Sequence, residues 1–146
     1  MRSLIALAFA TATAPALAQP PAAVTGSALY TEHCAACHGA QLEGAPDWQR
    51  RGPDGLFPAP PHDETGHTWH HGDGFLFAYT KYGGQTVLDE LGVAFTSGMP
   101  GFDGILTDTE IEAILAYISS TWPPEARAFQ QTQTAQEREE GRFQRP

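Results

Sequence analysis

Apolar side chains recur at helical spacing along several parts of the chain, and no segment alternates apolar and polar residues as a strand does. The clearest helix follows Thr107 and Glu110, which form a Thr-x-x-Glu capping box. Its apolar face is made of Ile111, Ile114, Leu115 and Ile118. The pair Pro123-Pro124 stops this run, because proline lacks the backbone N–H that a helix interior needs. The pattern predicts an all-helical domain.

Three further segments have helical character. The first runs from Gly26 to Cys37. A second begins with Asp73 as the expected N-cap and stops at Gly83-Gly84. A weaker one covers residues 87–95. These segments and the helix after Thr107 define one domain over residues 26–122.

Long loops separate the predicted helices. Residues 39–62 are interrupted too densely for long regular structure, by Gly44, Pro46, Gly52, Pro53, Gly55, Pro58, Pro60 and Pro61. Loops of this length are uncommon inside a small domain. They are understandable if a large apolar cofactor fills the centre and the loops wrap around it.

Both ends of the chain fall outside this domain. Residues 1–18 have the three parts of a secretory signal peptide: a basic Arg2, an uncharged apolar run, and small residues before Gln19. Residues 19–25 form a Pro/Ala-rich leader. The tail, residues 123–146, is rich in Gln, Glu and Arg and has few apolar residues to bury, so we expect a solvated helix or disorder.

Acidic side chains dominate the charge balance. Seventeen Asp and Glu face eight Lys and Arg, which gives a formal net charge of −9. This balance argues against nucleic-acid binding, which needs a basic surface. It is compatible with a protein partner that has a basic docking face. We expect no membrane span after Gln19, because no later segment is long and apolar enough.

The two cysteines of the chain occur in the sequence Cys34-Ala35-Ala36-Cys37-His38. This is the spacing of c-type haem attachment, in which two thiols bind the haem vinyl groups and the following histidine ligates the iron. A zinc site would need two more ligands nearby, and a redox dithiol would favour a βαβ setting. A disulfide this local would constrain the unfolded chain very little. We therefore expect one covalent haem c, held by Cys34 and Cys37 and ligated by His38.

On these features the sequence resembles the class I c-type cytochromes over residues 26–122. The matching features are Gly26, Tyr30, the motif from Cys34 to His38, Met99 within Ser97-Gly98-Met99-Pro100-Gly101-Phe102, and Tyr117. The resemblance implies a small all-α, cytochrome c-like fold around one haem. It also implies that two helices cross near Gly26, with Tyr30 and Tyr117 at the contact.

The resemblance implies further ligands. Met99 lies where this family places the second axial ligand, and it is the one methionine left once a signal peptide is removed. Met/His ligation raises the reduction potential. In the family a proline carbonyl accepts a hydrogen bond from the proximal histidine; of the five prolines in the long loop, we favour Pro60.

The histidine-rich segment from His62 to His71 departs from the family. It contains His62, His67, His70, His71, Asp63, Glu64 and Trp69. We favour a surface loop near the haem edge, with Trp69 against a propionate. The alternatives are a second metal such as copper, since imidazole suits copper and zinc, or a histidine replacing Met99 on the iron.

Together these features predict a periplasmic one-electron carrier that exchanges electrons with redox proteins and is not itself an enzyme. The alternatives are a haem subunit of a larger dehydrogenase or oxidase, a haem-based ligand sensor, and copper handling through the His62–His71 loop.

Overall fold

The computed structural model describes residues 25–143, and these residues form helices and loops without a strand. The signal peptide predicted at residues 1–18 lies outside the described residues. In chain order the elements are α1 (Gly26–His33), α2 (Ala35–His38), the short 3-10 helix η1 (Thr68–His70), α3 (Asp73–Tyr82), α4 (Gly84–Glu90), α5 (Asp108–Ser120) and α6 (Pro124–Glu139). The all-helical prediction is confirmed.

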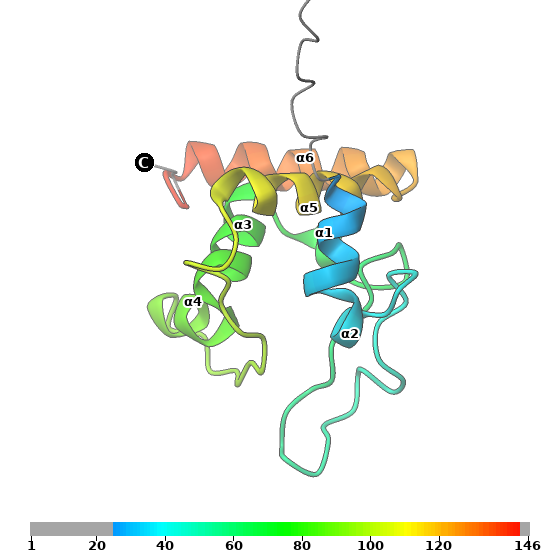
Figure 1. Ribbon diagram of the computed structural model, residues 1–146. Coiled ribbons are helices and arrows are strands. Elements are labelled where there is room, and N and C mark those ends of the chain that lie inside the picture. The colour runs from blue at the N-terminus through cyan, green and yellow to red at the C-terminus, as the bar shows by residue number, and fades with distance from the viewer. Residues whose placement is uncertain (1–24, 144–146) are drawn as a thin grey trace, which may run out of the picture.

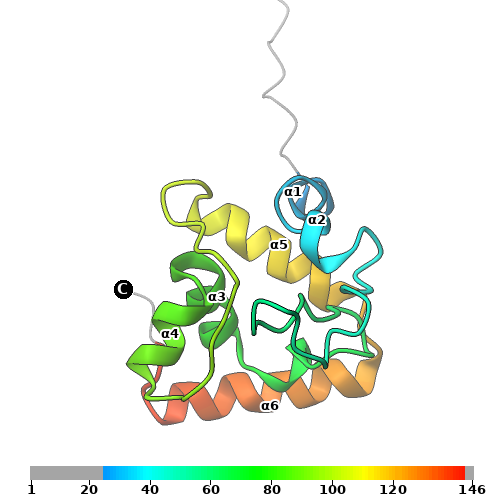
Figure 2. The ribbon, with the colours of Figure 1, turned by 90° about the horizontal axis from the view of Figure 1, so that it is seen from below.

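The helices form two walls joined at one end of the molecule. Helices α1 and α2 stand on one side, and α3 and α4 stand on the other (Figure 1). Helices α5 and α6 run across the end that joins them, and the loop after α2 extends toward the opposite end. Seen from below, the segment between α4 and α5 runs along the inner side of α3 and α4 and faces α2 (Figure 2).

Helices α1 and α5 cross at Gly26, as the family resemblance implies. A Cβ atom on Gly26 would lie 2.0 Å from the carbonyl oxygen of Ala113, so only glycine fits between the two backbones. One turn further on, the rings of Tyr30 and Tyr117 meet at a centroid distance of 5.6 Å. The crossing is continuous with the apolar core, in which Tyr30, Ile111 and Ile114 are fully buried.

Several helix boundaries differ from those predicted. The segment expected as one helix is divided at Cys34, whose φ of −119° interrupts α1 and α2. Helix α4 begins and ends earlier than the predicted residues 87–95. It does not reach residue 95 because Gly92 adopts a φ of +67° that turns the chain out of the helix. The capping box is confirmed: the Thr107 side chain accepts from the Glu110 N–H, and the Glu110 carboxylate accepts from the Thr107 N–H.

The tail was expected to be a solvated helix or disordered, and that expectation is only partly right. Residues 124–139 do form α6, but one face of it is buried, at Ala126, Gln130, Thr134 and Glu137. This face packs on η1 and α3. The small number of apolar residues did not indicate this buried face, because most of its buried side chains are polar and form hydrogen bonds.

The loop between α2 and η1 is fastened at its base. The Leu42 carbonyl accepts hydrogen bonds from the N–H groups of His62 at 2.7 Å and Asp63 at 3.2 Å. The Ala45 N–H also donates to the Ala59 carbonyl at 2.8 Å, so the two ends of the loop are bonded to each other.

None of the helices formed by residues 25–143 has the length and apolarity to cross a membrane.

Candidate functional site

The two cysteines lie within one turn of helix at the junction of α1 and α2. Cys34 is half-buried and Cys37 is exposed, and both are free thiols. The Cys37 N–H donates to the Cys34 carbonyl at 3.1 Å, which holds the pair on one turn. Burial, with a smaller contribution from Cys37, raises the pKa of the Cys34 thiol to about 11. Two free thiols on one turn are the arrangement that thioether attachment to a haem requires.

His38 ends α2 and is buried, with 8% of its surface exposed. Its Nδ1 lies 2.9 Å from the carbonyl oxygen of Pro60. A carbonyl can only accept, so Nδ1 carries the proton and Nε2 keeps its lone pair. Burial lowers the pKa of His38, and the bond to Pro60 opposes the shift. The ring is therefore neutral and oriented, as a metal-binding imidazole must be.

His62 packs flat against His38. The two ring centroids are 4.0 Å apart with an interplanar angle of 22°. His62 Nδ1 pairs with Thr68 Oγ1 at 2.8 Å, and its backbone carbonyl accepts from Trp122 Nε1 at 2.7 Å. Burial lowers the pKa of His62 to about 3, with smaller contributions from His38 and His67. The sequence left open that His62 binds a second metal or the iron; in the structure its ring lies against that of His38.

Met99 lies in the segment between α4 and α5 and is half-buried. Its carbonyl accepts from Gly84 N–H at 3.1 Å, and its own N–H donates to Ser97 Oγ at 3.2 Å. Ser97 in turn accepts from the Tyr79 hydroxyl at 2.7 Å. The backbone of this segment is thus bonded to α3 and α4, on the wall opposite α2 (Figure 2).

These donors fit a haem. The chain supplies two free thiols, a neutral imidazole whose Nε2 keeps its lone pair, and a thioether on the facing wall. Together they are the donor set that a covalent haem with His/Met ligation would need.

Trp69 and His70 form an aromatic cluster with Phe129, between η1 and α6. Trp69 Nε1 donates to the Glu64 carbonyl at 3.4 Å, and the indole contacts His70 and Phe129 at centroid distances of 3.9 and 5.6 Å. His71 stacks on Phe75 at 4.4 Å. Residues 25–143 contain no group of three or more His, Cys, Asp or Glu side chains placed to hold a metal ion. The copper alternative thus has no preformed site among them.

Two sets of hydrogen bonds near this site were not predicted from the sequence. The Tyr30 hydroxyl donates to the Gly39 carbonyl at 2.9 Å and approaches the His38 carbonyl at 3.3 Å. Thr68 bridges His62 and the Pro61 carbonyl. No spacing pattern could have indicated either, because each bond joins residues brought together only by the fold.

The family described as Cytochrome c matches residues 23–122 of the chain. No curated protein and no solved structure shows a significant match. Helix α6 lies beyond the matched segment.

Proposed function

Because the chain belongs to the cytochrome c family, whose domain is typical of electron-transfer proteins, we propose that it is a periplasmic one-electron carrier with a single haem c. Cys34 and Cys37 would hold the haem, and His38 and Met99 would ligate the iron. When bound, the haem would supply the redox chemistry, a one-electron change between Fe(III) and Fe(II). The observation that carries the proposal is the hydrogen bond from His38 Nδ1 to Pro60, which leaves Nε2 free to bind iron.

The protein's part is to hold these ligands still. Pro60 fixes the tautomer and rotation of His38, and a hydrogen bond of this kind also makes the imidazole a stronger ligand. His62 covers one face of the ring and restricts its tilt. Because His62 lies on the His38 side, it is badly placed to take the position that we assign to Met99. Ligands that stay in place in both oxidation states keep the reorganisation on electron transfer small.

Trp69 is proposed to lie near a haem propionate. Its Nε1–H makes only a long bond of 3.4 Å to Glu64, so it could turn toward an anionic group at low cost. The donors and acceptors are proposed to be other redox proteins. The formal charge of −9 favours partners with a basic docking face.

Visible spectra of the haem-loaded protein test the proposal. The haem should survive acid–acetone extraction, and the oxidised protein should show the weak sulfur-to-iron charge-transfer band at the red end of the spectrum. Met99→Ala should abolish the band and lower the reduction potential, since axial ligands set potentials over a range of about 0.8 V. Haem that is extracted would contradict the attachment; an unchanged spectrum in Met99→Ala would contradict the ligation.

A further inference from the structure

Helix α3 begins without a cap of its own. The sequence suggested Asp73 as the N-cap, but the structure makes Gly72 the N-cap residue, and no local side chain accepts from the first N–H groups. The four N–H groups at a helix start have no partner within the helix, and leaving them unpaired in a buried place costs stability. Some other part of the chain must supply the acceptors.

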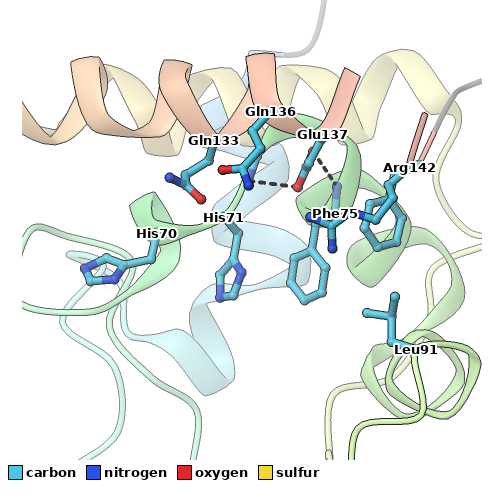
Figure 3. Close-up of a pocket in the computed structure, with 10 residues that line it drawn as sticks. His70, His71, Phe75, Leu91, Gln133, Gln136, Glu137 and Arg142 are labelled. Carbon is cyan, nitrogen blue, oxygen red and sulfur yellow. Dashed lines mark hydrogen bonds between the residues drawn. The ribbon is translucent and has the colours of Figure 1, made fainter. Parts of the chain in front are cut away.

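Glu137 of α6 supplies them. Its Oε1 accepts from the Gly72 N–H at 3.1 Å, and its Oε2 accepts from the N–H groups of Gly74 at 3.0 Å and Phe75 at 3.3 Å. Figure 3 shows Glu137 reaching from α6 to the start of α3. Thr134, one turn earlier on α6, accepts from the Asp73 N–H at 3.0 Å. The carboxylate charge also matches the positive end of the α3 dipole.

Glycines at positions 72 and 74 leave room for the Glu137 carboxylate beside the start of α3. A Cβ on Gly72 would lie 2.3 Å from Glu137 Oε2, and one on Gly74 would lie 3.1 Å from the same atom. Glu137 is also the one buried acid among residues 25–143. It borders a pocket of about 200 Å³ that includes His71 and Arg142. Because both carboxylate oxygens are bonded to the α3 backbone, its place is explained by capping rather than by a ligand in that pocket.

The other end of α3 holds the Met99 segment. The Lys81 carbonyl accepts from the N–H groups of Phe102 at 2.9 Å and Asp103 at 2.8 Å, just beyond Met99. Gly83 and Gly101 are in backbone contact: a Cβ on Gly83 would lie 2.8 Å from the Gly101 nitrogen. A ten-residue helix thus connects the Glu137 carboxylate to the segment that carries Met99.

We propose that Glu137 is a positioning residue for Met99: by capping α3 from outside the family domain, it stabilises the helix that holds the Met99 segment in place. The proposal rests on the proposed function in one respect, that Met99 binds the iron. On this proposal helix α6, which lies beyond the family domain, helps to position an iron ligand.

Amide hydrogen exchange on the haem-loaded protein tests the structural part. In Glu137→Gln one acceptor oxygen becomes an amide that faces N–H donors, and an unpaired buried donor costs about 1–3 kcal/mol. We expect the Phe102 and Asp103 amides to exchange about tenfold faster, which corresponds to about 1.4 kcal/mol. Amides of α1, at its crossing with α5, should change less. Glu139→Gln is the matched control, because Glu139 is exposed on the same helix and loses the same charge.

Imidazole titration of the ferric protein tests the consequence for Met99. Imidazole competes with a thioether for the iron, so a less stable Met99 segment should bind it about tenfold more tightly in Glu137→Gln. Two further variants distinguish the loss of the cap from a loss of side-chain packing at Glu137. Glu137→Ala should show the same gain, and adding Gly72→Asp, which places a local N-cap where the carboxylate was, should reverse it.

The outcomes separate the two proposals. If Phe102, Asp103 and α1 amides all accelerate equally, or if Gly72→Asp fails to rescue, Glu137 contributes only to global stability and the inference is wrong. If the wild-type protein lacks the sulfur-to-iron band while the exchange pattern holds, the ligation assigned to Met99 fails and the capping role of Glu137 stands.

Discussion

The crossing of α1 and α5 gives the sharpest stability prediction. In Gly26→Ala the new Cβ would lie 2.0 Å from the Ala113 oxygen, 2.6 Å from its carbonyl carbon and 3.0 Å from the Tyr117 Cβ. Ordinary contacts begin at 3.4 Å, so α5 would have to retreat by more than an ångström. The nearest atoms are backbone, and no rotamer change can relieve the clash.

The magnitude follows from two opposing effects. Overpacking of this kind costs about 1–3 kcal/mol. The upper part of that range applies because separating the helices also pulls apart the rings of Tyr30 and Tyr117. Alanine gains at most about 1 kcal/mol in helix propensity over glycine. The net loss should be about 2 kcal/mol, which at this chain length lowers Tm by roughly 8 °C.

Thermal unfolding of the haem-loaded protein, followed by far-UV circular dichroism, measures this loss. Ser27→Ala is the control, since Ser27 is exposed in the same helical turn. A Gly26→Ala protein whose stability falls within about 0.5 kcal/mol of wild type, the range of ordinary surface substitutions, would refute the close crossing.

Three further predictions concern other parts of the chain. Thr107→Ala should cost about 1 kcal/mol by opening the capping box, measured as a lower Tm, and an unchanged Tm would contradict the cap. Burial, together with His67 and His70, lowers the pKa of His71 to about 4. The unfolded chain therefore binds the proton more readily than the folded one. The stability contributed by neutral His71 is complete above pH 6.5 and is lost as the pH falls toward 4, by up to about 3 kcal/mol. Chemical denaturation of His71→Phe should therefore show a weaker loss over that pH range than wild type. Replacing His70 and His71 together should leave haem content intact, and calorimetry with Cu(II) should detect no one-to-one complex tighter than micromolar in either protein.

The capping box was predicted correctly because it is encoded in a short stretch, from Thr107 to Glu110. The motif from Cys34 to His38 is equally local, so haem attachment can be inferred from it without a fold, and that attachment stays part of the proposal. The crossing at Gly26 required the family resemblance, because one glycine indicates nothing alone. The hydrogen bond from His38 to Pro60 was expected on the same basis, and the structure contains it; its role beside a haem stays part of the proposal.

The features missed depend on contacts between distant residues. Asp73 has a side chain suited to an N-cap, yet the acceptor is Glu137, 65 residues beyond Gly72. The burial of α6 was missed for the same reason: a polar helix face is indistinguishable from a solvated one until its partners are known. His62 also depends on distant contacts: its residue type left a metal-binding role open, and the structure places its ring against His38.

The crossing of α1 and α5 also bears on the order in which parts of the chain can fold. Helix α1 has eight residues, too few to be stable alone in water, and its partner α5 lies at the far end of the domain. Tyr30 can therefore be buried only once Tyr117 of α5, whose ring it contacts, is in place. Until then the turn that carries Cys34 and Cys37 has no fixed structure to shield it, so both thiols stay accessible for as long as the C-terminal part of the domain is missing.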